Sequence, residues 1–216
     1  PMRLHTAFLI LGLGALPGCA ALSALQGEPD RDLYELRTPT QAPTGCGRAN
    51  INQLVVELPK TLGTQDRDRI MIRPSVLQTQ YLPDAQWGDT VPAMLQRLLV
   101  QSFSATDSFD HVGRAPLGVA GDYALISEIE DFNAELVPEG PGGPEGVIIR
   151  LSVEAQMIRE MDASVVSRSS FSANVPAAST RTQDLIPAFD AGTRQLVAQM
   201  TNWGLQASGV NPASCR

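Results

Sequence analysis

The chain has 216 residues, of which 43% are hydrophobic and 18% are charged, a balance typical of a globular protein and not of a disordered one. Its formal net charge is −7 at pH 7, and its Lys and Arg residues are scattered. This is not the charge pattern of a nucleic-acid-binding protein, nor of one held to anionic lipid by a polybasic patch. We therefore expect no nucleic-acid partner.

The chain opens with the pattern of a bacterial lipoprotein signal. A short positive region precedes the apolar or small residues 7–15, and Gly18 comes directly before Cys19. This run is shorter than the roughly 20 apolar residues of a membrane-spanning helix. We expect cleavage after Gly18 and lipid attachment at Cys19. The alternatives are an ordinary secretory signal with an incidental cysteine, or a buried helix, and Pro17 is unusual for a lipoprotein signal.

The rest of the chain divides into three parts after this signal peptide of residues 1–18. Residues 19–31 have no clear hydrophobic period and are typical of a tether, here one anchored by lipid. We expect one domain over residues 32–207, which is long enough for a sizeable core, and a C-terminal tail over residues 208–216.

The cysteine count fits this division. Assigning Cys19 to lipid leaves Cys46 and Cys215, which both lie in loop-like sequence rich in Gly, Pro and Ser. In an oxidising periplasm these two residues can form one bridge that ties the C-terminal tail to the N-terminal part of the domain. Two unpaired thiols in loops are the alternative.

The first half of the domain is predicted to hold short strands and one helix. The strands are expected at residues 32–37, 53–58, 69–73 and 76–82, with residues 81–87 as a loop before the helix. Asp89 and Thr90 are expected to cap this helix, and an apolar stripe follows from Val91 to Phe103.

The second half of the domain is predicted to have longer elements. Residues 122–136, 147–158 and 165–175 are predicted to form a three-stranded meander after a short strand at 108–112. Thr180 and Gln183 have the spacing of a capping box for a final helix that ends near Gly204. Helices on one sheet bury these faces economically. We therefore predict an α/β fold: a mixed, largely antiparallel sheet with two main helices packed on it, in a single domain.

Catalytic and metal-binding patterns are weak. His111 is the single histidine after residue 18, and the sequence has no Gly-x-Ser-x-Gly, H-E-x-x-H or C-x-x-C motif. Glu128 and Glu130 would share one face of a strand and could act as a carboxylate pair. A solvated strand face, or an edge charged against mispairing, is the more usual explanation. We expect no catalytic, cofactor-binding or metal-binding residue.

The segment from Tyr81 to Trp87 places two large aromatic residues in a chain with only 5% aromatic residues. Tyr and Trp are enriched at protein interfaces because they bury a large area and keep a polar group. One hypothesis is that Tyr81 and Trp87 belong to a partner interface. The other is that Trp87 fills the core at the entrance to the first helix.

Together these features resemble the ABC-type transport auxiliary lipoproteins. The resemblance is carried by the Cys19 signal, the segment from Asp68 to Pro74, the Tyr81-Leu82-Pro83…Trp87 segment, residues 95–100 and 121–125, and Ala188-Phe189-Asp190-Ala191. It extends from about Tyr34 to Trp203. Pro17 and the Cys46/Cys215 pair depart from the pattern.

The resemblance implies a non-enzymatic α/β lipoprotein in the periplasm that assists an ABC permease and ATPase. It implies a partner with an MCE domain, lipid transport between the two membranes, an outer-membrane location and a homo-oligomeric ring. Ala20 and Ala21 after Cys19 fit outer-membrane placement because no aspartate is present to favour retention at the inner membrane. Two other functions remain open: a stand-alone envelope lipid-binding or outer-membrane assembly lipoprotein, and a carboxylate-dependent periplasmic hydrolase.

Overall fold

The fold was analysed in a computed structural model, which describes residues 30–39, 43–115, 121–138 and 145–216. Contacts within the chain define one unit over Arg31–Arg216 and separate it from Pro1–Asp30. All elements below belong to the Arg31–Arg216 unit. The predicted signal peptide, and most of the predicted tether including Cys19, lie outside the described residues.

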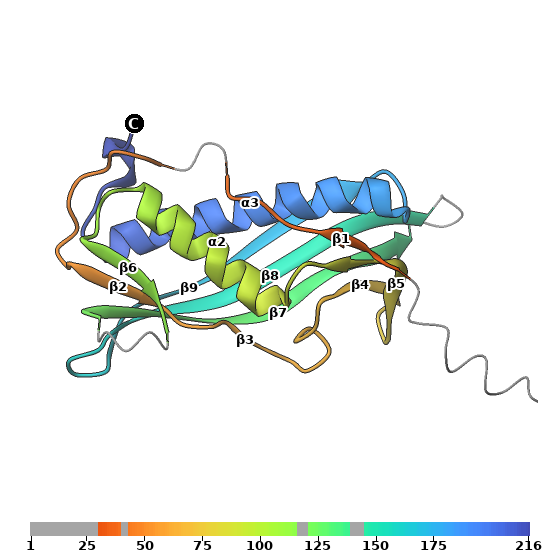
Figure 1. Cartoon of the computed structure of the whole chain (residues 1–216), viewed down its shortest axis with the longest axis horizontal. Helices are drawn as coiled ribbons and strands as arrows, with labels where there is room; N and C mark the ends of the chain where they lie inside the picture. The colour runs from red at the N-terminus through yellow and green to blue at the C-terminus, as the bar shows by residue number, and fades with distance from the viewer. Residues whose placement is uncertain (1–29, 40–42, 116–120, 139–144) are drawn as a thin grey trace, which may run out of the picture. The chain divides into compact units, whose positions relative to one another are not determined.

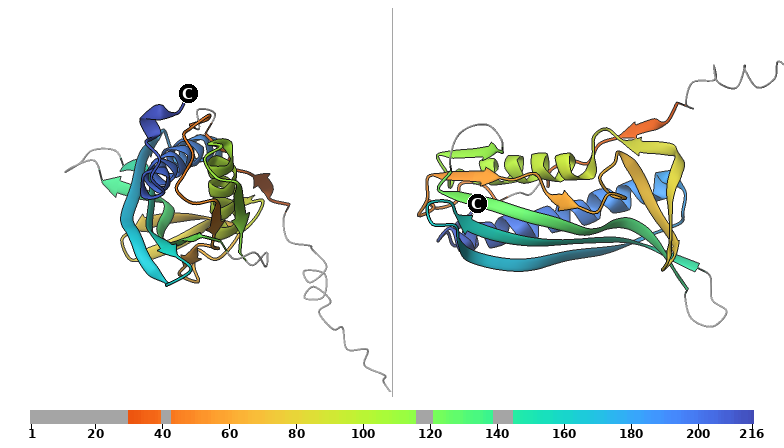
Figure 2. Two further views of the ribbon diagram at one scale, coloured as in Figure 1. Left: turned by 90° about the vertical axis from the view of Figure 1, so that its left-hand side faces the viewer. Right: turned by 90° about the horizontal axis from the view of Figure 1, so that it is seen from below.

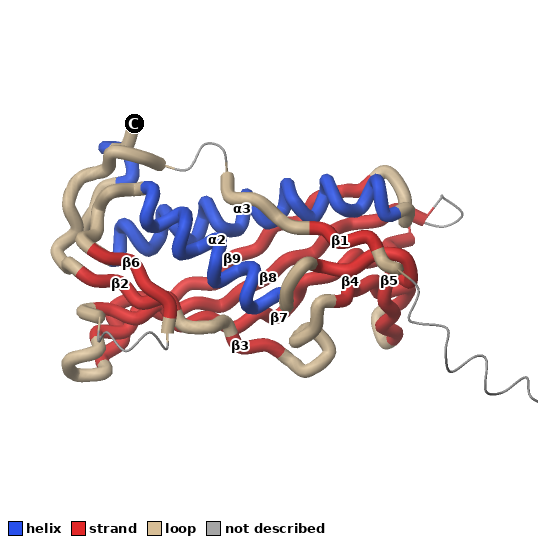
Figure 3. The backbone as a smooth tube through the Cα atoms, in the orientation of Figure 1, coloured by secondary structure: helices blue, strands red, loops and turns tan. Residues whose placement is uncertain are grey.

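The described unit contains short strands and a helix, then three long strands and a longer helix (Figures 1 and 3). In chain order the elements are β1 (Asp32–Tyr34), β2 (Gln53–Val56), β3 (Lys60–Thr61), β4 (Arg69–Ser75), β5 (Gln78–Trp87), α2 (Val91–Ala105), β6 (His111–Arg114), β7 (Tyr123–Pro138), β8 (Glu145–Arg159), β9 (Ser164–Ala177), α3 (Thr182–Ala207) and the 3-10 turn η2 (Pro212–Ser214).

β7 organises the sheet. Along one edge it pairs antiparallel with β8, which pairs antiparallel with β9. Along the other edge it pairs parallel with three short strands in succession: β2 near Ala124, β3 near Glu128 and β4 near Ala134. β4 and β5 form an antiparallel hairpin, and β1 and β6 extend the sheet with parallel pairings. This mixed, largely antiparallel sheet with two helices confirms the predicted fold class.

Both helices cover the same face of the sheet (Figure 2). The strands alternate in burial, so that inward residues of β8 such as Ile149, Leu151 and Val153 are fully buried. A Cβ atom on Gly204 of α3 would lie 2.5 Å from Cζ of Phe103 in α2. The two helices can approach this closely because position 204 has no side chain.

The structure corrects several predicted boundaries. Residues 81–87 are not a loop but the last seven residues of β5. They pair irregularly with β4: Tyr81 lies opposite Met71 and Gln86 opposite Arg69, and the register shifts between these pairs. Pro83 lies in the segment where the register shifts. Because the ladder of hydrogen bonds is already interrupted there, the strand tolerates a residue without an N–H, and the sequence shows no regular alternation.

The helix starts also differ from the predicted caps. Thr90 occupies the N-cap of α2 but makes no side-chain capping bond; instead Asp89 Oδ1 accepts a hydrogen bond from the Thr90 amide at 2.7 Å. The capping box predicted at Thr180 is absent because α3 begins at Thr182, with Arg181 at the N-cap. The first turn is organised instead by Ser179, Arg181 and Asp184.

Candidate functional site

Trp87 is a core residue, which corrects its assignment to a partner interface. Its side chain is 1% exposed. Its ring packs edge-on against Phe189 of α3 at 5.3 Å between centroids and against Phe132 of β7 at 6.1 Å. Because β5 delivers Trp87 beneath the helices, the side chain joins the sheet to α3 and cannot contact a partner.

Tyr81, at the other end of the same segment, is half-buried. Its hydroxyl donates a hydrogen bond to the carbonyl of Thr64 at 2.8 Å. The guanidinium of Arg69 lies 5.6 Å from the ring centroid, within cation–π range. The two aromatic residues of the segment therefore have different surroundings, and Tyr81 alone retains an accessible edge.

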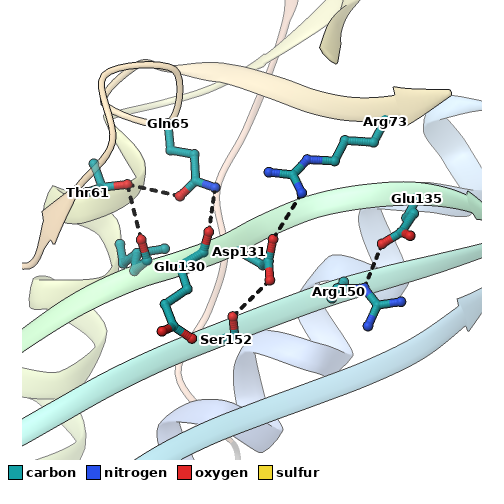
Figure 4. Close-up of polar contacts among 9 residues, drawn as sticks. Thr61, Gln65, Arg73, Glu130, Asp131, Glu135, Arg150 and Ser152 are labelled. Atoms are coloured by element: carbon teal, nitrogen blue, oxygen red, sulfur yellow. Dashed lines mark hydrogen bonds and ion pairs between the residues drawn. The ribbon is translucent and has the colours of Figure 1, made fainter. Parts of the chain in front are cut away.

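Two carboxylates of β7 form ion pairs across the outer face of the sheet (Figure 4). Asp131 lies 3.3 Å from Arg73 and accepts a hydrogen bond from Ser152 at 3.1 Å. Glu135 is 2.6 Å from Nε of Arg150. These partners hold the two carboxylates in place, between strands β4, β7 and β8.

Glu130 lies at an irregularity in β7, where the pairing with β8 shifts between Ile129 and Asp131. The side chain of Gln65, which is 4% exposed, donates a hydrogen bond to the Glu130 carbonyl at 3.0 Å (Figure 4). Gln65 also accepts a hydrogen bond from Thr61 at 2.9 Å. The prediction that Glu128 and Glu130 form a carboxylate pair assumed that side chains alternate regularly along the strand. The register shift at Glu130 interrupts that regular alternation.

Glu128 is exposed and lies in register with Lys60 on one side and Glu154 on the other. Glu154 in turn lies 3.8 Å from Arg168 of β9. Cations thus flank the two opposed glutamates on the outer strands. This is the arrangement expected of a solvated sheet face, where alternating charges offset the repulsion of like charges in register.

His111 is exposed at the start of β6, in register with Gln53 of β2. The carboxylate of the preceding Asp110 forms an ion pair with Arg48. Asp110 therefore has Arg48 as its ion-pair partner. Among the described residues, no group of three or more His, Cys, Asp and Glu side chains is arranged to hold a metal ion.

Cys46 and Cys215 are joined by a disulfide in the structure. Neighbouring backbone bonds run beside it: the amide of Arg216 donates to the carbonyl of Thr44 at 2.8 Å, and the amide of Cys46 donates to the carbonyl of Thr106 at 3.0 Å. The C-terminal segment and the loop before β2 are thus held against the end of α2.

Two surface cavities have the size of a small-molecule site. One, of about 530 Å³, is lined by residues 50–52, 121–123 and 159–161. Its main carboxylate, Asp122, accepts hydrogen bonds from the amides of Asn52 and Gln53 at 2.8 and 2.9 Å. The other, of about 600 Å³, lies between residues 82–84 and 180–183. There Asp84 accepts a hydrogen bond from Thr182 at 3.2 Å. Asp122 and Asp84 thus bind groups of the protein itself.

Sequence reasoning missed one exposed apolar feature, the turn between β4 and β5. Val76 is 84% exposed and Leu77 is 98% exposed. The signal that could have identified it is an apolar pair at a turn flanked by Pro74, Ser75 and Gln78, where polar residues or glycine are usual. Within the described part of the chain, no helix is long and apolar enough to cross a membrane.

Comparisons with known proteins agree with this fold. The solved structures that the chain matches along most of its length include protein XCC0632 from Xanthomonas campestris, a DUF330 protein, and an uncharacterized protein. The first has a TM-score of 0.69 and 23% identity and covers 82% of this chain and 97% of its own. The second has a TM-score of 0.59 and 13% identity and covers 81% and 99%. At these identities the likeness shows the fold alone. No curated protein matches the chain.

The family comparison extends over most of the described unit. The model for the ABC-type transport auxiliary lipoprotein component matches residues 34–201, from the end of β1 into the last turns of α3. This match confirms the resemblance seen in the sequence. The chain therefore belongs to the family of ABC-type transport auxiliary lipoprotein components.

Proposed function

We propose that this chain is a non-enzymatic, membrane-anchored periplasmic lipoprotein that serves an ABC-type, MCE-associated lipid transport system between the inner and outer membranes. The observation that carries the proposal is the family match over residues 34–201, which assigns the folded unit to transport auxiliary components. The MCE-domain partner, the permease and ATPase and the lipid cargo belong to this proposal.

The proposed anchor is Cys19, after removal of residues 1–18. Residues 19–31 would then act as the tether, residues 32–207 as the auxiliary domain and residues 208–216 as its C-terminal tail. Each buried methylene of an acyl chain contributes about 0.8 kcal/mol, so that two or more chains hold a protein stably at a membrane. Ala20 and Ala21 support an outer-membrane location.

The proposed action is docking. On the outer sheet face Asp131 and Glu135 are paired with arginines, and Glu128 lies in register with Lys60. Such a surface suits recognition by a partner with a matching charge pattern. Tyr81 remains part of the proposed partner surface, whereas buried Trp87 does not. A homo-oligomeric ring is the proposed assembly.

The test is isolation of the palmitate-labelled lipoprotein from solubilised envelopes, followed by identification of the co-isolated proteins. We expect label on the wild type, no label on Cys19→Ala, and an MCE-domain protein with its ABC permease and ATPase in the isolate. Tyr81→Ala should lower the yield of partner several-fold. Tyr81→Phe is the matched control, because it keeps the ring and loses only the hydrogen bond to Thr64.

Three results would argue against the proposal. Absence of label on the wild type would remove the anchor. A labelled lipoprotein that isolates with lipid but without transporter components would favour the stand-alone lipid-binding function. Turnover of an envelope substrate that is lost in Glu128→Gln would favour the hydrolase.

A further inference from the structure

The β4–β5 turn carries an apolar pair that the fold does not require. β4 ends at Ser75 and β5 begins at Gln78, and these two residues are paired, so that Val76 and Leu77 form the turn. Neither residue has the positive φ angle of a primed hairpin turn. Turns in general favour Gly, Pro, Asn, Asp and Ser, and the backbone of this turn tolerates Val and Leu without calling for them. Turn geometry therefore does not explain this pair.

The sheet register places this turn at one end of β7. β4 runs parallel to β7, with Arg73 opposite Glu135, so that the turn lies beyond the carboxyl end of β7 near Pro138. The β8–β9 turn lies at the other end, where Tyr123 pairs with Arg159. β7 has 16 residues, which corresponds to about 50 Å at a strand rise of about 3.3 Å per residue. The two turns are thus far apart.

The chain enters the sheet from the side of the β4–β5 turn. β1 is parallel to β5, with Asp32 opposite Ala85 and Tyr34 opposite Trp87. β5 leads away from the turn, so a chain followed backwards from Tyr34 to Asp32 runs towards it (Figures 1 and 2). Twelve residues separate Cys19 from Asp32, and a chain of that length spans at most about 40 Å. A lipid attached at Cys19 would therefore allow this end of the sheet to reach the membrane.

The turn can enter an apolar phase without carrying a charge with it. Residues 74–82 contain no Asp, Glu, Lys, Arg or His. Burying an unpaired charge in lipid is costly, and burying apolar side chains is favourable. The composition of the hairpin end therefore matches the acyl boundary of a bilayer.

We propose that Val76 and Leu77 insert into the lipid surface to which the protein is anchored. The acyl chains would hold the protein at the membrane, and the inserted turn would be a second contact that restricts the orientation of the sheet. This inference rests on the proposed attachment at Cys19. The alternative contacts for Val76 and Leu77 are a second copy of the chain and a transporter partner, and the experiment distinguishes these from lipid.

The experiment uses the lipidated full chain in vesicles of phosphatidylethanolamine and phosphatidylglycerol, with and without lipids brominated on their acyl chains. Leu77→Trp adds a fluorophore at the turn, and the emission of Trp87 and Trp203 is subtracted using the wild type. We expect the added emission to shift to shorter wavelength and to lose most of its intensity in brominated vesicles. Val76→Trp reads the same turn if Leu77→Trp does not fold.

The matched control is Met161→Trp, at the β8–β9 turn, where Met161 is 87% exposed. We expect its added emission to stay at long wavelength and to be unaffected by bromination. Both variants should float with the vesicles as the wild type does.

Four outcomes would overturn the insertion. Wild type that fails to float would remove the proposed anchor and, with it, the insertion. Flotation with an unquenched Leu77→Trp would overturn the insertion alone and leave the anchor standing. A blue shift of the added emission that occurs without quenching and grows with protein density would assign the turn to a contact between copies of the chain. A blue shift without quenching that appears only when transporter components are added would assign the turn to a contact with that partner.

Discussion

Three aromatic side chains meet where the sheet and α3 approach each other. Trp87 stands edge-on to both Phe132 and Phe189, whose rings stack at 5.6 Å with an interplanar angle of 24°. All three residues are buried, with exposures of 1%, 3% and 0%. Because they come from β5, β7 and α3, this cluster joins elements that are distant in sequence.

Trp87→Ala should therefore destabilise the fold. Truncation of a buried Trp leaves a cavity and costs about 3–5 kcal/mol, a large part of the 5–15 kcal/mol of a typical domain. Urea unfolding of the purified protein, followed by far-UV circular dichroism, measures the change. Tyr81→Ala is the control from the same strand and should cost much less, because its side chain is half-buried. Equal losses in the two variants would contradict this account.

At the scale of elements, the start of α3 is organised by Asp184. Its carboxylate accepts a hydrogen bond from the Ser179 hydroxyl and lies 2.9 Å from Nη2 of Arg181. The Ser179 bond, followed by the Arg181 contact, lowers the pKa of Asp184. The carboxylate also lies in the first turn, where a negative charge interacts favourably with the helix dipole.

This arrangement predicts a pH-dependent contribution to stability. Because the pKa of Asp184 is lower in the folded than in the unfolded protein, its stabilising effect is present above the unfolded pKa of about 3.9 and is lost as the pH falls through the folded pKa. Asp184→Asn should therefore lower the urea midpoint at pH 7, and the difference from wild type should narrow as the pH is lowered below about 4.

Ser179→Ala is the companion variant, because it removes the largest cause of the lowered pKa and keeps the carboxylate. It should reproduce part of the pH-dependent loss. A constant difference between Asp184→Asn and wild type from pH 7 to pH 3 would mean that the asparagine acts through packing and not through charge.

At the scale of the whole molecule, the Cys46–Cys215 disulfide closes nearly the entire described unit. The two residues are separated by 169 positions. A cross-link restricts the unfolded chain more as the closed loop grows, and the chain-entropy model gives about 5 kcal/mol for a loop of this size. Engineered and native bridges typically contribute about 2–4 kcal/mol.

The double variant Cys46→Ser/Cys215→Ser should lower the free energy of unfolding by about 2–5 kcal/mol. Reductant should lower the urea midpoint of the wild type and leave that of the double variant unchanged, so that the reduced wild type and the variant converge. A non-reducing gel and a thiol count on the denatured protein check the bridge itself. Free thiols at both positions would contradict the structure.

Periodicity was enough to predict the long elements. β7, β8, β9 and both helices were located within a few residues, because long amphipathic segments repeat their pattern many times. The class of fold followed from their order. The apolar stripe of α2 and the alternation in β8 are local properties, since each side chain's direction is fixed by the backbone period alone.

Short-range patterns failed where pairing with a distant strand decides the conformation. Residues 81–87 became strand because β4 and β1 bond to them on either side, and nothing in their own sequence encodes those partners. The irregularity at Glu130 is likewise supported by Gln65, which is 65 residues away. The sequence was compatible with Trp87 either at a partner interface or in the core. Only the packing of α3 against its ring shows that it is a core residue.

By itself the sequence determined the fold class and the signal that points to Cys19, because these depend on the order and periodicity of residues along the chain, and its motifs carried the resemblance to the family. Only the tertiary structure decided which carboxylates are paired, that Trp87 is enclosed while Tyr81 is not, and that Val76 and Leu77 project from the sheet. Burial and ion pairing depend on which distant segments meet in space, and a linear pattern does not specify those contacts.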